Sequence, residues 1–256
     1  MGDAGAPLAL VTGGVRRLGA AIAARLARSG YALALHGHHD TEPDVGLAKV
    51  LKDHATQWAG LAADLSDPAA PADLIDRVIA QFGRAPDLLV NNASLFRYDD
   101  WTDMTAAGLA EHMQVNALSP VMLARELEAR AGPDQQPAIV HIVDQRVRNP
   151  NGDQLSYTLA KQALAESIRT LARAFGARAR INGVAPGLTI ATADYDDAQM
   201  ERLAGRMPLG RLSAPDEIAD AVLYLADAKS VTGQMVFVDG GAHMIGFERD
   251  FLFMER

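Results

Sequence analysis

Tyr157 and Lys161 are the residues of this sequence whose types and spacing most directly allow proton-transfer chemistry. They stand four positions apart inside an amphipathic stretch, residues 155–175, so on a helix they share one face, one turn apart. An ammonium beside a phenol stabilises the phenolate, so we expect the pKa of Tyr157 to fall from about 10 toward neutrality. Such a tyrosine is a usable general acid at physiological pH. An ordinary surface pair with the same spacing is the structural alternative.

A glycine-rich segment near the N-terminus, residues 12–19 (TGGVRRLG), lies between an apolar run and a helical pattern. Glycines let backbone approach a pyrophosphate, and the free N–H groups of a helix N-terminus favour negative charge there. The segment therefore predicts a dinucleotide site that uses Gly13, Arg17, Leu18 and Gly19. Arg17 could also contact a second ligand beside the nicotinamide, because a guanidinium forms charge-assisted hydrogen bonds. The alternatives are an ordinary glycine-rich turn and a solvated surface arginine.

The segment after the second apolar run indicates which dinucleotide binds. An acidic residue about 20 positions after the glycines would bind the ribose 2′-OH of NAD. Here the sequence has His36, Gly37, His38 and His39, followed by Asp40. Small and imidazole side chains leave room for a 2′-phosphate, which partly protonated His38 and His39 could contact, so we predict NADP(H). Asp40 argues for NAD instead, because a carboxylate repels a 2′-phosphate.

Short apolar runs alternate with longer helical stretches along the chain, which predicts an α/β fold: a doubly wound, Rossmann-type parallel sheet of about seven strands with helices on both faces. The expected strands are residues 8–12, 32–36, 60–62, 88–91, 139–143, 181–184 and 235–238. The expected helices are residues 20–29, 72–82, 106–130 with a break near Pro120, 155–175 and 215–225. We expect one domain over residues 1–256 and a substrate loop over residues 188–212, with a short helix near 198–204.

Composition limits the classes of protein and of partner. The 256 residues are 49% hydrophobic, enough to bury a core without disulfides or metal. The absence of cysteine excludes a disulfide framework, a thiolate zinc site and a cysteine nucleophile, and we assign no metal site. A net charge of −8 argues against nucleic-acid and anionic-membrane partners. The first residues lack a basic region followed by a long apolar run, so we expect no signal peptide and a cytoplasmic location.

The chain resembles the short-chain dehydrogenase/reductase family through motifs that occur in the family's order and approximate spacing. They are residues 12–19, Asn91-Asn92-Ala93, Asn116, Tyr157 with Lys161, Pro186-Gly187 and Asp239-Gly240-Gly241. The resemblance implies a single Rossmann-type domain, a dinucleotide-dependent oxidoreductase and, as is common in the family, a homo-tetramer. It also implies that Asn116 maintains a proton relay through water to Lys161. The cofactor contacts that it implies, beyond those of residues 12–19, come from His36, His38, His39, Asp64, Leu65, Asn92, Ala93, Ser94, Tyr157, Lys161, Pro186, Gly187 and Thr189.

Within this family the chain is most similar to the pteridine reductases, including the bacterial dihydromonapterin reductases. Arg17 stands where the family usually has a glycine, as it does in those enzymes, and residues 92–96 (NASLF) resemble their N-A-S-x-F segment. Asp144 stands thirteen residues before Tyr157, where the wider family has a serine. The resemblance implies that Phe96 stacks on the pterin ring; packing of Phe96 on the core is the alternative. The substrate-binding residues that it implies are Arg17, Ser94, Phe96, Asp144 and Tyr157.

Asp144 also favours one substrate class on physical grounds. Reduction of a ketone develops negative charge on the substrate oxygen, and an ionised carboxylate about 4 Å away opposes this by roughly 4 kcal/mol at an effective dielectric of about 20. Reduction of a ring C=N bond instead creates a basic nitrogen that must take a proton. A carboxylic acid, alone or with Tyr157 and a water, can supply that proton. The alternative is that Asp144 points away and only ends a strand.

We therefore expect an NADPH-dependent reductase that converts a 7,8-dihydropterin, such as dihydromonapterin or dihydrobiopterin, to its tetrahydro form. Its expected catalytic residues are Asn116, Asp144, Tyr157 and Lys161. The alternatives are another carbonyl or imine reductase of the family, for example of the 3-oxoacyl type, and a catalytically silent NADP-binding protein. The tail, residues 247–256, is too apolar to be free, so we expect it to cover a neighbouring subunit or to close a substrate pocket.

Overall fold

The computed structural model describes residues 5–190 and 195–255, so residues 191–194 of the expected substrate loop and residue 256 of the tail lie outside the described residues. Within the described residues, seven parallel strands form one sheet in the order β3-β2-β1-β4-β5-β6-β7. The strands are β1 (Leu8–Val11), β2 (Ala32–Gly37), β3 (Trp58–Ala62), β4 (Leu88–Asn91), β5 (Ala138–Ile142), β6 (Arg180–Pro186) and β7 (Met235–Val238). The predicted fold class is confirmed.

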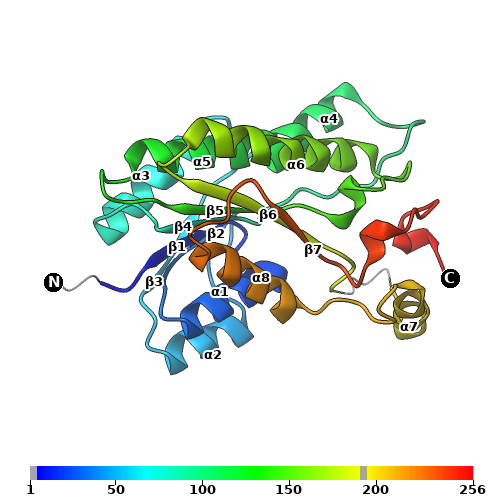
Figure 1. Ribbon diagram of the computed structural model, residues 1–256, viewed down its shortest axis with the longest axis horizontal. Helices are drawn as coiled ribbons and strands as arrows, with labels where there is room; N and C mark the ends of the chain where they lie inside the picture. Colours follow the sequence, from blue (N-terminus) through cyan, green and yellow to red (C-terminus); the bar gives the residue numbers. More distant parts are fainter. Residues whose placement is uncertain (1–4, 191–194, 256) are drawn as a thin grey trace.

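Helices cover both faces of the sheet (Figure 1). One side carries α1 (Arg17–Arg28), α2 (Val45–Asp53) and α8 (Pro215–Asp227). The other carries α3 (Ala70–Phe82), α4 (Ala106–Met113), α5 (Ser119–Arg130) and α6 (Leu155–Phe175). Figure 1 shows α7 (Asp197–Arg206) beside the C-terminal segment. None of the helices in the described part of the chain combines the length and the apolar character that a membrane crossing requires.

The central strand β1 shows why the sheet needs a helical layer on each face. Its four residues are all buried, and successive side chains of a strand point to opposite faces. Ala9 and Val11 accordingly pack into the apolar core that includes α1 and α8, whereas Leu8 and Leu10 pack into the core that includes α3 and α5. A strand buried on both sides is typical of a parallel sheet in an α/β protein.

The helices differ from the sequence prediction at two places. Helix α2 was not predicted, although Asp44 accepts a hydrogen bond from Leu47 N at its start and Leu47 and Leu51 bury one face. The predicted break near Pro120 is instead a π-helical turn, Gln114–Leu118, between α4 and α5. The π-helical turn runs directly into α5, and Pro120, which has no N–H to donate, interrupts the helical hydrogen bonds just after it.

The order of the strands indicates where a ligand would bind. The chain runs outward from β1 to β3 on one side, then returns to β4 on the other side of β1. In such sheets ligands bind at the carboxyl ends of the strands where the order reverses. The segments that follow β1, β4, β5 and β6 meet at this edge, and they contain most of the predicted site residues.

Candidate active site

Helix α6 presents Tyr157 and Lys161 from its first two turns, and both side chains are buried. Leu164 and Ile168 continue the same buried face and anchor the helix to the sheet. The helix has the predicted bounds, and the pair therefore belongs to a buried face and not to a surface.

Asp144 follows the end of β5 and faces Tyr157. The Tyr157 hydroxyl donates to Asp144 Oδ2 at 2.9 Å. The other carboxylate oxygen, Oδ1, accepts from the backbone N–H of Arg146 at 2.9 Å and from its Nε at 3.3 Å. The structure thus brings the predicted acid and the predicted phenol into direct contact.

The pKa of Tyr157 departs from the sequence expectation. Burial is the largest cause and the negative charge of Asp144 the second, and together they raise the pKa of the phenol well above 10. The expectation that Lys161 lowers this pKa toward neutrality is wrong for this chain, because the Lys161 Nζ lies 5.7 Å from the Tyr157 ring centroid whereas Asp144 contacts the hydroxyl. Tyr157 therefore keeps its proton at neutral pH.

Lys161 lies deeper than the tyrosine and bonds to the backbone. Its Nζ donates to the carbonyl of Ile142, the last residue of β5, at 2.9 Å. Burial lowers the pKa of Lys161 to about 8, although the carboxylate of Asp144 opposes the shift. Its neighbour His141 is also buried, and burial lowers the pKa of that imidazole to about 3, so His141 stays neutral.

The glycine-rich turn after β1 is built for close backbone packing. Thr12 Oγ1 accepts from the backbone N–H groups of Asn92 and Ala93, and Asn92 Nδ2 donates to the carbonyls of Thr12 and Gly13. Gly13 has a φ of +60°, and a Cβ at Gly19 would lie 1.9 Å from the Gly13 carbonyl oxygen. The turn thus requires glycine at both positions, and Asn92 and Ala93 support it.

The start of α1 is open to an anion. Its N-cap, Arg16, makes no side-chain capping hydrogen bond, so the described residues leave the first helical N–H groups without a side-chain cap. Such N–H groups bind phosphate oxygens. Arg17, the first helical residue, is exposed and has a φ of +54°, a left-handed conformation that favours glycine. The arginine therefore occupies a glycine-like backbone position.

The residues expected at the adenosine end have different environments. His36 is buried, its Nδ1 accepts from the Gly13 N–H at 3.1 Å, and its Nε2 lies 3.0 Å from the Ala63 carbonyl. Burial lowers the pKa of His36, so a neutral imidazole ring supports the glycine-rich turn through its hydrogen bond from Gly13. By contrast, His38 and His39 are exposed and stack with ring centroids 3.7 Å apart. These two rings are accessible to a ligand.

Near this end, Asp64 also faces the exposed histidines. Asp64 Oδ1 lies 3.5 Å from His38 Nε2, and the backbone N–H of Ser66 is the main cause that lowers the pKa of Asp64. Leu65 is buried, and its carbonyl accepts from Ser119.

Asn116 holds the segment that carries Phe96. It lies in the π-helical turn, is fully buried, and its Oδ1 accepts from Leu95 N at 2.7 Å and from Ser94 Oγ at 3.2 Å. Its Nδ2 donates to the Leu95 carbonyl at 2.8 Å. Single π-helical turns are frequent at functional sites. The amide of Asn116 thus positions residues 94–96, while its expected relay to Lys161 stays a prediction.

A cavity of about 320 Å³ lies between the segments that follow β1, β4, β5 and β6. Arg17, Phe96 and Asp144 line it, with Pro186, Gly187 and Thr189 after β6. The Phe96 ring packs edge-on against the Tyr157 ring, with centroids 4.8 Å apart, and it is 53% exposed. A half-exposed aromatic face beside a proton donor can hold a flat ring. The cavity thus brings together residues predicted for the cofactor and residues predicted for the substrate.

Comparison with known sequences decides the family. The profile of the family described as "Enoyl-(Acyl carrier protein) reductase" matches residues 14–243. The chain belongs to the short-chain dehydrogenase/reductase family. It is an oxidoreductase.

Relatives of this short-chain dehydrogenase/reductase have two kinds of name. A 3-oxoacyl-[acyl-carrier-protein] reductase FabG of Pseudomonas aeruginosa is 35% identical over 250 residues, covering 93% of this chain and 97% of the relative. Pteridine reductase 1 of Leishmania tarentolae is 32% identical over 278 positions, covering 92% and 96%. Among solved structures, FolM alternative dihydrofolate reductase 1 of Brucella suis, in complex with NADP, has a TM-score of 0.85 and 34% identity, covering 96% of this chain and 98% of that one.

The roles of Arg146 and Tyr195 at the reductase site were not predicted from the sequence: Arg146 binds Asp144, and both residues line the cavity. Asp250, Phe251 and Leu252 also line it, and they belong to the tail for which closure of a substrate pocket was one of the two expectations. Arg146 stands two residues after Asp144, so its position was a usable signal. Asp250 is 104 residues from Arg146 and carries no local signal.

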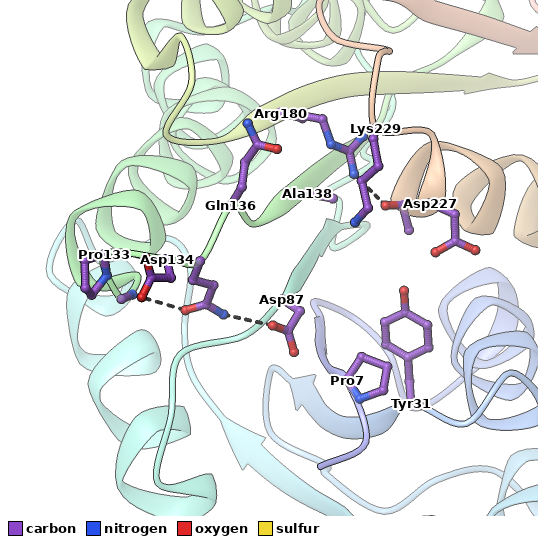
Figure 2. Close-up of a pocket in the computed structure, with 13 residues that line it drawn as sticks. Pro7, Tyr31, Asp87, Pro133, Asp134, Gln136, Ala138, Arg180, Asp227 and Lys229 are labelled. Atoms are coloured by element: carbon purple, nitrogen blue, oxygen red, sulfur yellow. Dashed lines mark hydrogen bonds between the residues drawn. The ribbon is translucent and has the colours of Figure 1, made fainter. Parts of the chain in front are cut away.

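A larger cavity, of about 820 Å³, lies at the opposite end of the reductase's sheet (Figure 2). Its residues precede or begin strands, as Tyr31 does for β2, Asp87 for β4 and Arg180 for β6. Figure 2 shows Tyr31 and Lys229 pointing into it. Arg180 and Asp87 are already bonded: Arg180 donates to the carbonyls of Leu225, Ala226 and Ala228 at the end of α8, and Asp87 accepts from Leu8 N and Arg84. We assign the reaction to the smaller cavity.

Proposed function

We propose that this chain is an NADPH-dependent pterin reductase that converts a 7,8-dihydropterin to its tetrahydro form. The observation that carries the proposal is the hydrogen bond of 2.9 Å from the Tyr157 hydroxyl to Asp144, inside a cavity that Phe96 also lines. A carboxyl group at this place suits protonation of a ring nitrogen. The pteridine reductase and alternative dihydrofolate reductase among the relatives support the same substrate class.

The residues at the carboxyl end of the sheet fit an NADP(H) molecule. The open start of α1 suits the pyrophosphate, and the exposed pair His38 and His39 suits a 2′-phosphate. Pro186 to Thr189 and Lys161 would lie at the nicotinamide end. When bound, the cofactor supplies the hydride. Two solved relatives, from Brucella suis and Brucella canis, are NADP complexes, which supports this choice of dinucleotide.

Tyr157 and Asp144 would deliver the proton. A dihydropterin that takes a hydride on its ring carbon must take a proton on the adjacent nitrogen. The raised pKa of Tyr157 keeps a proton on its hydroxyl, which points at Asp144 Oδ2. Tyr157 would therefore keep its proton and orient the carboxyl group through this hydrogen bond, while Asp144 in its acid form would give a proton to the ring nitrogen and take another from solvent that enters the cavity.

Phe96 and Arg17 would hold the substrate. The Phe96 ring is half-exposed at the cavity and offers an apolar face to a flat pterin. Arg17 lines the same cavity, and its guanidinium can donate to pterin oxygen or to phosphate. Ser94 lies beside them, held by Asn116.

Reduction of a 3-oxoacyl thioester is the second candidate function. It is favoured by the acyl-carrier-protein reductases among the relatives, at up to 35% identity, and by the description of the matching family. The Asp144 carboxylate opposes an oxyanion at the reacting carbon, by roughly 4 kcal/mol at about 4 Å and a dielectric of about 20. The ion pair of Asp144 with Arg146 reduces that opposition, so assays must separate the two candidates.

The test is NADPH oxidation with dihydromonapterin, dihydrobiopterin and an acetoacetyl thioester. We expect kcat/KM for a dihydropterin to exceed that for the thioester, and kcat/KM for NADPH to exceed that for NADH. Turnover of the thioester alone would replace the proposal by the second candidate. No turnover of either compound, with NADPH still bound, would favour a silent NADP-binding protein.

The variant Asp144→Ser tests the chemical reason for the proposal, because serine is what the wider family has at this position. It removes the acid that protonates nitrogen and the negative charge that opposes an oxyanion. We expect kcat/KM for the dihydropterin to fall by about a hundredfold, while kcat/KM for the thioester stays unchanged or rises. Equal losses with both substrates would remove the argument from Asp144.

Assembly and location stay predictions. The family resemblance implies a homo-tetramer, which light scattering of the purified protein would measure. The composition and N-terminal sequence suggest the cytoplasm, which fractionation of cells would test.

A further inference from the structure

The C-terminal segment, residues 247–255, is fixed against the reductase site. Phe247 and Phe251 are buried and pack edge to face, with centroids 4.9 Å apart. Gln199 on α7 donates to the carbonyl of Met254 at 2.7 Å, and the Asp250 backbone N–H donates to Asp153 at 2.7 Å. Side chains of this segment line the cavity that contains Asp144. The segment is thus a wall of the site and not a loose end.

Arg146 joins this segment to the reacting groups. Its Nη2 donates to Asp250 Oδ2 at 2.5 Å, its Nη1 to Gln154 Oε1 at 2.8 Å, and its Nε to Asp144 Oδ1 at 3.3 Å. All three guanidinium nitrogens are therefore bonded to protein groups. The guanidinium carbon lies 5.2 Å from the centroid of the Tyr157 ring.

Asp250 gives the buried Arg146 a second anionic partner besides Asp144. The side chains of Arg146 and Asp250 are 8% and 6% exposed, so neither is free to meet water. Asp144 and Asp250 together raise the pKa of Arg146, against its burial. A buried cation that loses one of two anionic partners bonds more closely to the other. Without Asp250, Arg146 would move toward Asp144 and compete with the Tyr157 hydroxyl for that carboxylate.

We propose that Asp250 is a positioning residue of the reaction: by holding Arg146, it leaves one oxygen of Asp144 directed at the Tyr157 hydroxyl. Asp250 acts through Arg146 and touches neither of the proton donors. The inference rests on the proposed reductase site and holds for whichever substrate that site reduces. It makes Asp250, in the C-terminal segment, a working part of the active site.

The test is a double-variant cycle between positions 250 and 144, with activity measured per mole of folded protein. Asp250→Asn keeps the size of the side chain and an oxygen acceptor but removes the charge. We expect it to lower kcat by about tenfold to a hundredfold, since a misplaced reacting group has effects of this size, with KM for NADPH unchanged. In an Asp144→Asn background the same change should lower kcat by less than about twofold, because coupled residues are non-additive.

Two further variants separate positioning from packing. Arg249, in the same segment, pairs with Asp153, and Arg249→Gln breaks this ion pair. It keeps the hydrogen bonds of Arg146 to Asp144 and Asp250 and that of the Asp250 backbone N–H to Asp153, so kcat should stay unchanged. Arg146→Lys keeps the buried charge but cannot bond to three partners, so it should reproduce the loss seen with Asp250→Asn, again only when Asp144 is present. If Asp250→Asn folds poorly, Arg146→Lys carries the same test.

Three results would overturn the positioning role: equal losses from Asp250→Asn in both backgrounds, the same loss from Arg249→Gln, or no loss from either Asp250→Asn or Arg146→Lys. Each variant is assayed with the substrate that the unaltered protein reduces fastest. Failure of the unaltered protein to reduce a dihydropterin contradicts only the proposed substrate. Absence of coupling between positions 144 and 250 contradicts only the inference.

Discussion

The two cavities at opposite ends of the sheet contain the same kinds of groups. A buried tyrosine with a raised pKa belongs to each region: Tyr157 contacts Asp144 in the wall of the carboxyl-end cavity, and Tyr31 lines the amino-end cavity. Burial is the largest cause in both, and it raises the pKa of Tyr31 to about 12 with help from Asp227 and Asp87. Each cavity also has carboxylates and cations, and the cavity at the amino end is the larger one. Size and perturbed pKa therefore do not separate them.

The two cavities differ in the groups to which their buried arginines bond. In the carboxyl-end cavity Arg146 bonds to Asp144, and Asp144 accepts from the Tyr157 hydroxyl, so charge and proton donor form one connected set. In the amino-end cavity Arg180 donates to backbone carbonyls at the end of α8, where it acts as a helix cap. A connected set can move a proton, whereas a cap holds two elements together. The comparison shows that connectivity, more than pKa alone, identifies the reacting groups.

Exchange of each tyrosine for phenylalanine should give the largest contrast. Tyr157→Phe removes the proton donor, and we expect kcat to fall by about a thousandfold. Tyr31→Phe removes a phenol that also has a raised pKa from the other cavity and should leave kcat and KM unchanged. Steady-state NADPH oxidation measures both. An unchanged kcat in Tyr157→Phe would mean that the reductase chemistry lies elsewhere or that the chain is catalytically silent.

Removal of the amino-end arginine should have the opposite effect: a loss of stability without a loss of activity. Arg180→Met removes hydrogen bonds from a buried cation to the last carbonyls of α8, so we expect the free energy of unfolding to fall by about 3 kcal/mol. The activity of the remaining folded protein should not change. Urea unfolding and initial rates at equal folded concentration measure the two quantities. A loss of kcat without a loss of stability would show that the amino-end cavity takes part in the reaction.

The fold was predictable because its strongest signals are local and repeated. Helix α6 has the predicted bounds, since its buried face repeats along 21 residues, and β7 also has the predicted bounds. Strand β3 gave a weak signal because it is an edge strand with only Leu61 buried. Helix α2 was missed because it is short and buries only Leu47 and Leu51.

Spacing alone indicated the site where its residues are near in sequence, whereas distant residues such as Arg17, Phe96 and Pro186 were predicted from the family's motifs. Tyr157 and Lys161 share one helix, and the thirteen-residue spacing brought Asp144 into consideration. The direction in which the pKa of Tyr157 shifts was not predictable, since it depends on burial and on Asp144 more than on Lys161. The contact of Arg146 with Asp250 closes a separation of 104 residues, which only the folded chain establishes.

Lys161, buried behind the carboxyl-end cavity, and Lys229 of the amino-end cavity should differ in their effect on the pH dependence of stability. The pKa of Lys161 is lowered by burial from 10.5 to about 8. Between these values the unfolded chain binds more protons than the folded one, so stability from this group rises with pH in that window, by at most about 1.4 kcal/mol per pH unit. The raised pKa of Tyr157 acts in the opposite direction, but only above pH 10.

Urea unfolding at several pH values between 8 and 10 measures this difference. Lys161→Met should flatten the rise in stability with pH, because it removes the buried ammonium. The matched change Lys229→Met removes an exposed lysine of the amino-end cavity and should leave the slope unchanged. Equal slopes in the unaltered protein and in Lys161→Met would mean that Lys161 keeps its ordinary pKa.

The smallest effect concerns the backbone at the entrance of the carboxyl-end cavity. Arg17 and Ala55 both have left-handed φ values, +54° and +48°, and both are exposed, but only Arg17 lines that cavity. A non-glycine residue in this conformation costs of order 1 kcal/mol, so Arg17→Gly and Ala55→Gly should each raise the free energy of unfolding by up to about that amount. Arg17→Gly should also lower kcat/KM for NADPH and for the dihydropterin, whereas Ala55→Gly should change neither. Gains in stability with unchanged kinetics in both variants would show that the arginine has no part in binding and that its strained backbone has no functional compensation.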